Sequence, residues 1–332
     1  MSDDTFNQET GCVLVPNDER DYDIALLMPQ GGEDLPPLPK KHIMPPKKIL
    51  HQERIDSCVG HGGTLAHSTN EGVLLSPRYT WAMCKKLDHY RGWGTTVYNM
   101  MKVMRTGCLP YNQHIVDNSG LERDLYMRPN LPNNHRELAD PFRVHSFWRV
   151  KDWDRGKDTT SLQEAMYRFN VPLITTLPWY KNFKPDRKGF LPLPDTKRSF
   201  SGHLVVCNGY HTDRKGVYFS FVNSWGNAWG KKGHFYIYAK DLHKFRFRGF
   251  HAPLDVPQNK AKVLNKYQGR IVRNHPTDDD HFPEHYYVGK GKIAHIGSGQ
   301  KFVFGRDNGF WGDWWTTLTI AEPLRGTEDF KF

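Results

Sequence analysis

Three residues that together can perform nucleophilic chemistry stand at separate places in the sequence. Cys58 precedes a glycine-rich stretch that can begin a helix, His203 opens a β-rich run, and Asn223 begins Asn-Ser-Trp-Gly-Asn-Ala-Trp-Gly. A thiol at a helix N-terminus feels the positive end of the helix dipole, which favours the thiolate. A nearby imidazole can hold the proton, and an asparagine side chain can orient that ring. The residue types therefore predict a thiol nucleophile paired with a histidine base.

The surroundings of these residues resemble the papain-like cysteine peptidase family over about residues 45–240. Residues 222–235 follow that family's Asn-Ser-Trp-Gly-x-x-Trp-Gly-x-x-Gly-Tyr-Phe pattern closely. Residues 52–58 read Gln-Glu-Arg-Ile-Asp-Ser-Cys, against the family's Gln-Gly-x-Cys-Gly-Ser-Cys. The remaining similar stretches, in the family's order, are residues 75–79, 92–95 and 202–210.

The resemblance implies a catalytic role for four residues. Cys58 would attack a peptide carbonyl, and His203 would act first as its base and then as the acid for the leaving amine. Asn223 would orient His203. The side chain of Gln52 and the backbone N–H of Cys58 would donate hydrogen bonds to the oxyanion. The expected activity is that of a cysteine peptidase, a hydrolase of peptide or protein substrates that needs no metal and no cofactor.

The resemblance also implies three substrate-binding residues. Gly94, in the glycine-rich wall of the family's substrate cleft, would pair its backbone with an extended substrate, because a Cβ there would obstruct close approach. Trp93 beside it would line a side-chain pocket. Trp225 would cover the contact between Asn223 and His203 and exclude water.

The sequence departs from the family pattern at several positions. Ile55 and Arg91 stand where the family has the two halves of a disulfide, and Val59 replaces the aromatic residue that usually follows the nucleophile. Cys84 matches a frequent half-cystine position without an identifiable partner. The family's inhibitory prosegment has about a hundred residues, and the 57 residues before Cys58 are too few for one of that kind.

The elements that must position these residues divide into helices first and strands later. A helix is expected after Cys58, where Gly60, Gly62 and Gly63 indicate close packing against its neighbours. Apolar spacing predicts helices at residues 95–104, with Thr95 or Thr96 as cap, and 161–169. Three β-rich runs follow residue 203. The predicted fold is α+β: a two-lobed papain-like domain with a helical lobe and an antiparallel β lobe, followed by a small all-β module.

Composition and charge set the expected organisation. The chain of 332 residues carries 46 Lys and Arg against 36 Asp and Glu, a net charge of +10. Its domains are predicted as an extended N-terminal strap at 1–44, a peptidase domain at 45–250 and a β-rich module at 251–332. The basic excess concentrates in residues 240–273, but no nucleic-acid motif frames it, so a specific nucleic-acid partner is not expected. Aromatic residues reach 13%, which argues against disorder.

Five cysteines in a chain of this length do not form a disulfide framework. The acidic, polar start is not a secretory signal, and no stretch is long and apolar enough to span a membrane. The expected location is therefore the cytoplasm, or the inside of a virion.

Several alternatives remain open at this stage. The peptidase fold could persist as a structural or interaction component of a large assembly such as a phage virion, with or without activity, and residues 251–332 could attach it. His61 and His67 could bind a metal, although their spacing places them on different helix faces. The acidic run at residues 278–280 is a cation site or a solvated loop. Tryptophans at 311, 314 and 315 stack on sugars, form a docking patch or fill a small core.

Overall fold

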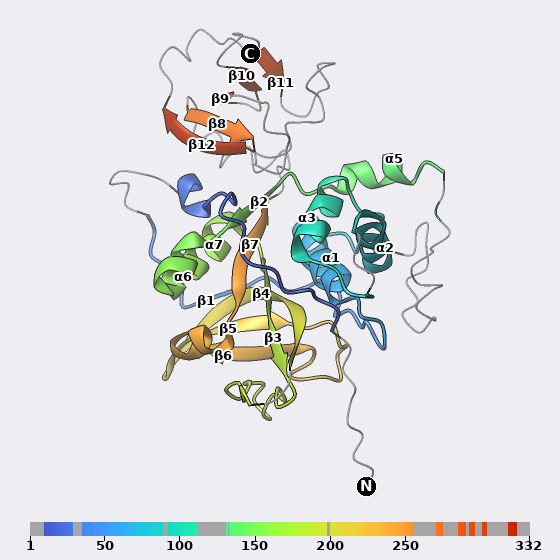
Figure 1. Ribbon diagram of the computed structural model, residues 1–332. Helices are drawn as coiled ribbons and strands as arrows, with labels where there is room; N and C mark the ends of the chain where they lie inside the picture. Colours follow the sequence, from blue (N-terminus) through green and yellow to red (C-terminus); the bar gives the residue numbers. More distant parts are fainter. Residues whose placement is uncertain are drawn as a thin grey trace.

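The computed structural model describes residues 10–28, 35–88, 92–111, 131, 133–197 and 200–254, and the backbone of five strands between residues 270 and 323. Its helices fall into two groups (Figure 1): α1, α2 and α3 lie together on one flank of strand β7, and α6 and α7 lie on the other. The helical segments are η1 (Ile24–Leu27), α1 (Cys58–Glu71), α2 (Pro77–Leu87), α3 (Val97–Arg105), α5 (His135–Ala139), η2 (Asp140–Phe142), α6 (Lys151–Gly156), α7 (Thr159–Phe169) and η3 (Ala239–Phe245).

The helix starts follow from their capping residues. Thr96 caps α3 by accepting a hydrogen bond from the Asn99 N–H at 3.1 Å, so the helix expected at 95–104 forms one to two residues later. Asp158 caps α7 through the Thr160 N–H at 2.9 Å. This carboxylate cap begins α7 two residues before the position that apolar spacing predicts.

One antiparallel sheet of seven strands forms the other lobe. Its order is β2-β7-β3-β4-β5-β6, and β1 also pairs with β4. The strands are β1 (Lys41–Ile43), β2 (Ser146–Arg149), β3 (Leu173–Tyr180), β4 (Phe200–Asp213), β5 (Gly216–Val222), β6 (His234–Tyr238) and β7 (Arg248–Leu254). The predicted α+β class with an antiparallel β lobe is confirmed.

Helix α1 is the central element, and its glycines let three neighbours approach it. A Cβ on Gly60 would lie 2.5 Å from the Cβ of Trp81 in α2, and one on Gly62 would lie 2.2 Å from Leu204 Cδ2 in β4. A Cβ on Gly63 would meet the sulfur of Met100 in α3 at 1.9 Å. The predicted close packing is therefore confirmed, and it brings the start of α1 against β4.

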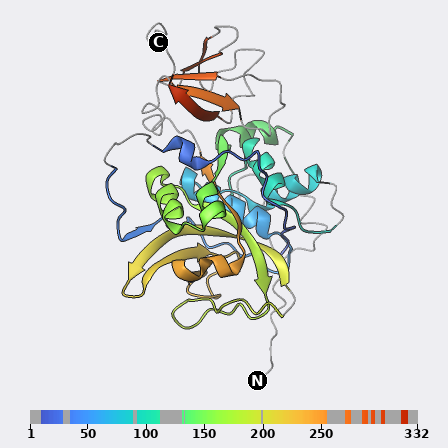
Figure 2. The ribbon, with the colours of Figure 1, turned by 60° about the vertical axis from the view of Figure 1, so that its left-hand side comes forward.

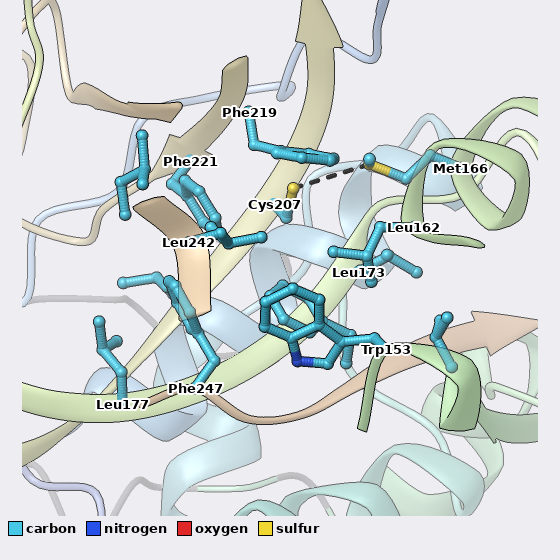
Figure 3. Close-up of a cluster of buried hydrophobic side chains, with 14 of the residues drawn as sticks. Trp153, Leu162, Met166, Leu173, Leu177, Cys207, Phe219, Phe221, Leu242 and Phe247 are labelled. Atoms are coloured by element: carbon cyan, nitrogen blue, oxygen red, sulfur yellow. Dashed lines mark hydrogen bonds between the residues drawn. The ribbon is translucent and has the colours of Figure 1, made fainter. Parts of the chain in front are cut away.

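The main hydrophobic core lies between the sheet and helices α6 and α7 (Figure 3). Aromatic side chains fill much of it. Phe221 stacks on Phe247 at 5.2 Å between ring centroids, and the Cys207 thiol lies 3.7 Å from the sulfur of Met166. Figure 2 shows these helices covering one face of the curved sheet. Burial of this apolar surface is the dominant stabilisation of such a fold.

The N-terminal strap is held to the domain by a buried charged cluster. Asp21 contacts Arg149 Nη1 at 3.2 Å, the Tyr98 hydroxyl at 2.9 Å and His251 Nε2 at 3.3 Å. Burial by itself would raise the pKa of Asp21, but His251, Tyr98 and Arg149 together lower it below its usual value. The strap therefore has a fixed anchor, from which it runs between the two groups of helices (Figure 1).

Five further strands pair in a second antiparallel sheet of order β11-β10-β9-β8-β12. They are β8 (Arg270–Asn274), β9 (His285–Gly289), β10 (Lys292–His295), β11 (Lys301–Val303) and β12 (Leu318–Pro323). The first sheet extends to Leu254, and the division of the chain near residue 250 stays a prediction. The acidic run at 278–280 and the tryptophans at 311, 314 and 315 lie outside the described residues. In the described part of the chain, no helix is long and apolar enough to cross a bilayer.

Candidate active site

Cys58 is the first residue of α1 and is fully buried. Its backbone N–H does not point into solvent but donates to the carbonyl of Thr10, at 3.1 Å. Burial raises the pKa of its thiol well above the usual value, and the nearby Cys12 thiol and Asp56 carboxylate raise it further. Because the backbone N–H of Leu204 acts in the opposite direction, the thiol must lie beside that residue of β4. Burial outweighs the helix dipole here, and the thiol is protonated.

His203 and Asn223 meet on the sheet, as the sequence predicts. The distance from His203 Nε2 to Asn223 Oδ1 is 2.7 Å, and both side chains are buried. The same Oδ1 accepts the Ser224 N–H at 2.8 Å, which fixes the orientation of the amide. Since Oδ1 can only accept, Nε2 carries the ring proton and Nδ1 is the basic nitrogen.

The basic nitrogen of His203, Nδ1, is not engaged in this conformation. Among the described residues, Nδ1 has no hydrogen-bond partner. Burial lowers the pKa of His203 to about 4, although the bond to Asn223 raises it. At neutral pH the site therefore holds a neutral thiol and a neutral imidazole, and not the thiolate–imidazolium pair that catalysis would need.

Two tryptophans enclose the imidazole of His203. Trp225 stacks on the ring at 4.8 Å between centroids and 27° between planes, which is the covering position predicted for it. Trp179 of β3 packs edge-on at 4.9 Å, and the two indoles contact each other at 5.0 Å. Trp179 carries no motif, and its place follows from the β3–β4 register, which pairs it with Ser201. Both indoles exclude water from the His203–Asn223 contact.

Gln52 is also fully buried, and its side chain reaches the same Thr10 carbonyl as the Cys58 N–H. Its Oε1 accepts a hydrogen bond from Ser224 Oγ at 2.5 Å, and its backbone N–H donates to the Ser224 carbonyl at 2.8 Å. Its Nε2 donates to the Ile55 carbonyl at 2.8 Å and reaches the Thr10 carbonyl at 3.4 Å. Ser224, which follows Asn223, therefore fixes Gln52 relative to the sheet, a positioning role that residue spacing does not reveal.

The carbonyl of Thr10 occupies the position between the two predicted oxyanion donors. It accepts from the Cys58 N–H and lies within reach of Gln52 Nε2. The strap continues along the site: the Cys12 N–H donates to the carbonyl of Gly202, the neighbour of His203, at 3.1 Å. A peptide segment of this chain thus fills the place where the resemblance puts a substrate carbonyl.

The same segment pairs with the residues of the glycine-rich wall. The Thr95 N–H donates to the Gly11 carbonyl at 3.0 Å, and the Val13 N–H donates to the Thr95 carbonyl at 2.9 Å. Gly94, the residue predicted to make such pairing, lies directly beside it, since a Cβ on Gly94 would meet the Gly11 oxygen at 2.7 Å. Its own carbonyl accepts from Lys85. In this conformation the backbone pairing falls on Thr95.

A polar clamp holds this wall in place. The ammonium of Lys85 in α2 donates to the carbonyls of Gly92 and Gly94, each at 2.8 Å, and lies 3.0 Å from Asp88. Asp88 accepts from Thr95 Oγ1 at 2.6 Å. Lys85 and Asp88 side chains are only 4% and 6% exposed, so the pair is shielded from solvent. The clamp ties the wall to α2 close to where the family's disulfide would attach it.

At Ile55, one of the two positions of the family's disulfide, this chain has a hydrophobic cluster instead. Ile55 is buried with Trp81, and Trp93 packs against both. Trp93 is half-buried in this cluster. Arg91 lies outside the described residues. All five cysteines lie within the described residues and none forms a disulfide.

The two histidines of α1 do not share a ligand site. His61 Nδ1 contacts Ser57 Oγ at 3.1 Å, whereas His67 Nε2 contacts Glu71 at 3.3 Å. Burial lowers the pKa of His61 to about 4. Within the described ranges, no group of three or more potential ligands is arranged to hold a metal ion.

A central helix that begins at a cysteine and packs against an antiparallel sheet carrying a histidine–asparagine pair is the architecture of papain-like proteins. The comparisons with known proteins agree with this class. Residues 83–246 match the model of the papain family cysteine proteases, a range that includes His203 and Asn223 but not Cys58. The match and the fold together support a papain-type cysteine peptidase.

Individual relatives are distant. A cathepsin B-like protein of Giardia intestinalis, CP3, is 29% identical over 185 residues, which span 54% of this chain and 57% of the relative. Xylellain, a cysteine protease from Xylella fastidiosa, superimposes with a TM-score of 0.59 at 18% identity and covers 75% of this chain and 98% of its own. Procathepsin B S9 from Trypanosoma congolense reaches a TM-score of 0.50 at 13% identity, over 75% and 87% of the two chains. At these identities the two structures establish a shared fold.

Proposed function

We propose that this chain is a cysteine peptidase that is latent while residues 10–13 occupy its active site. The observation that carries the proposal is the Thr10 carbonyl, which accepts from the Cys58 N–H and lies near Gln52 Nε2. Two convergent donors beside a nucleophile are the arrangement that stabilises a tetrahedral oxyanion. In the proposed latent state, the Thr10 carbonyl would take the place of a substrate carbonyl between these donors.

The proposed reaction begins when residues 10–13 leave the site. Water then reaches Cys58 and His203, burial no longer opposes charge, and the thiol can transfer its proton to His203 Nδ1. The thiolate attacks the substrate carbonyl carbon, and the oxyanion receives hydrogen bonds from the Cys58 N–H and Gln52. His203 returns the proton to the leaving amine, and then activates the water that hydrolyses the acyl-enzyme. Asn223 keeps the ring oriented throughout.

The latent state accounts for the protonation of the site. Neutral Cys58 and neutral His203 are the forms that burial favours, and the docked segment supplies part of that burial. The proposal also explains the tight fit of Gly202, where a Cβ would meet the Cys12 oxygen at 2.0 Å. We further propose a reducing location for the protein, the cytoplasm or a virion interior, which is supported by five cysteines without a disulfide.

A thiol-directed epoxide inhibitor tests the proposal. The reduced full-length chain is incubated with the inhibitor, digested, and mapped by mass spectrometry. We expect labelling of Cys58 that is lost in Cys58→Ala and reduced at least 100-fold in His203→Ala. His211→Ala is the matched control, because His211 lies on the same strand, stacked on Tyr218 and remote from Asn223. Equal labelling of His203→Ala and the wild type would contradict the proposal.

A further inference from the structure

Backbone hydrogen bonds hold Cys12 within the candidate active site. Its N–H donates to the Gly202 carbonyl at 3.1 Å, and its flanking residues Gly11 and Val13 both bond to Thr95. Its side chain is buried with that of Cys58 in one hydrophobic cluster. The strap therefore places a second thiol next to the proposed nucleophile.

Both cysteines lie along the same edge of β4. Cys12 contacts the Gly202 carbonyl, and the Cys58 thiol is influenced by the Leu204 N–H. In an antiparallel strand, residues two apart direct their backbone groups to the same edge, so these two anchor points are neighbours. The proximity is also electrostatic, since the Cys12 thiol raises the pKa of Cys58. A disulfide needs Cα atoms within about 7 Å, which adjacent anchor points on one strand edge make accessible.

We propose that Cys12 and Cys58 form a reversible disulfide when the protein meets a peroxide, which locks the strap into the active site. The inference rests on the proposed function for the reactivity of Cys58. In the docked state both thiols are protonated, and burial raises the pKa of Cys12 to about 12. Oxidation therefore begins during a brief opening, when Cys58 becomes a thiolate.

The chemistry balances with one peroxide per disulfide. The Cys58 thiolate attacks one oxygen of hydrogen peroxide, the O–O bond breaks, and after protonation of the leaving hydroxide the products are a sulfenic acid and water. When the strap docks again, the Cys12 sulfur attacks the Cys58 sulfur, the S–O bond breaks, and the proton of Cys12 leaves with the hydroxide as a second water. The two sulfurs are oxidised by two electrons in total, and the peroxide is reduced by two. A dithiol reverses the reaction by thiol–disulfide exchange.

The disulfide would block the activity of Cys58 and would also protect its sulfur from irreversible oxidation. Without a neighbouring thiol, a sulfenic acid proceeds to the irreversible sulfinic and sulfonic acids. Cys12 is placed to intercept it at the first stage. Cys207 lies in the other core cluster, beside Met166. Cys84 shares the cluster of Cys58, but its thiol is influenced by Asp88, Lys85 and Cys108 and not by Cys58.

The experiment treats the full-length reduced protein with about ten equivalents of hydrogen peroxide, enough for successive oxidations of one thiol, followed by alkylation, digestion without reductant and mass spectrometry. We expect a peptide pair linked through Cys12 and Cys58, which disappears after dithiothreitol. In Cys12→Ser, and equally in Cys12→Ala, Cys58 should instead appear as sulfinic or sulfonic acid. Cys84→Ser is the matched control and should retain the linked pair. After oxidation and dithiothreitol, epoxide labelling should recover to at least 80% in the wild type and below 20% in Cys12→Ser.

A Cys58 that is oxidised while Cys12 stays fully alkylated, or that pairs with another cysteine, would overturn the inference. The result is independent of turnover, because linkage is identified by mass. Epoxide labelling of the reduced chain without any linked pair would leave the peptidase proposal standing and refute the disulfide. A linked pair in a chain that the epoxide never labels would support the disulfide and contradict the peptidase proposal.

Discussion

Substituting Gly11 by alanine should release the strap and expose the nucleophile. Gly11 has φ +85°, a conformation that costs an L-residue about 1–2 kcal/mol, and an added Cβ would lie 2.0 Å from the Asp56 carbonyl oxygen. Because the obstructing atoms belong to the backbone, the clash cannot be relieved by a side-chain rotation. Residues 10–13 must therefore shift away from the start of α1 in Gly11→Ala.

The magnitude follows from the contacts that dock the segment. Five hydrogen bonds join residues 10–13 to Gln52, Cys58, Thr95 and Gly202. At about 1 kcal/mol each they contribute roughly 5 kcal/mol before the entropy of ordering the strap is subtracted. A penalty of about 2 kcal/mol from the alanine shifts the docking equilibrium by about 30-fold. We expect the second-order rate constant for epoxide labelling of Cys58 to rise by about that factor.

The assay needs a control for backbone strain alone. Gly72, the C-cap of α1, has φ +70°, and its nearest neighbour is the flexible end of Lys47 at 3.7 Å. Gly72→Ala therefore imposes similar strain away from the active site and should leave the labelling rate unchanged. If Gly11→Ala labels within threefold of the wild type while its circular dichroism is native, residues 10–13 do not limit access and the reasoning is refuted.

Three further predictions follow, and the two that measure turnover are made in the Gly11→Ala background. Lys85→Met removes the wall clamp and should raise KM for a peptide substrate at least tenfold with kcat within threefold; a kcat effect alone would contradict this role. Asn223→Ala should lower kcat on the order of 10²-fold, since the base loses its orientation, whereas an unchanged kcat would exclude that function. In the wild type, lowering the pH from 6.5 towards 4 should release the strap. His203 has a pKa of about 4 when the strap is docked, whereas an exposed imidazole has a pKa near 6.5. The open state therefore takes up a proton that the docked state cannot, and acid favours opening. Hydrogen exchange of the Cys12 amide, corrected for its intrinsic pH dependence, measures that release, and equal protection at both pH values would disprove it.

The anchor of the strap responds to acid in the same direction. The pKa of Asp21 is lowered in the docked state, so its contribution to docking is present above its ordinary pKa and is lost as the pH falls below that value. Release through His203 precedes it on acidification, because the imidazole titrates at higher pH. Acid therefore weakens first the contact at the active site and then the anchor.

The sequence by itself determined the features that depend on local chemistry. The Asn-Ser-Trp-Gly stretch predicted the His203–Asn223 pair with Trp225 over it, because this family pattern encodes the contact. Thr95 or Thr96 as cap predicted the start of α3 to within two residues, because a cap acts within three residues of its own position. The glycines after Cys58 predicted close packing, since only a residue without a Cβ allows it.

Only the tertiary structure decided what occupies the active site. The Thr10 group that meets Cys58 and Gln52 is a backbone carbonyl, which every residue possesses and no motif marks. Trp179 reaches His203 through strand register, and Lys85 reaches the wall through the packing of α2, so neither leaves a pattern in the chain. The protonation of Cys58 and His203 also depends on burial, which is a property of the folded surroundings. Residue types predicted the chemistry of the site, and long-range backbone contacts decided that its resting state is closed.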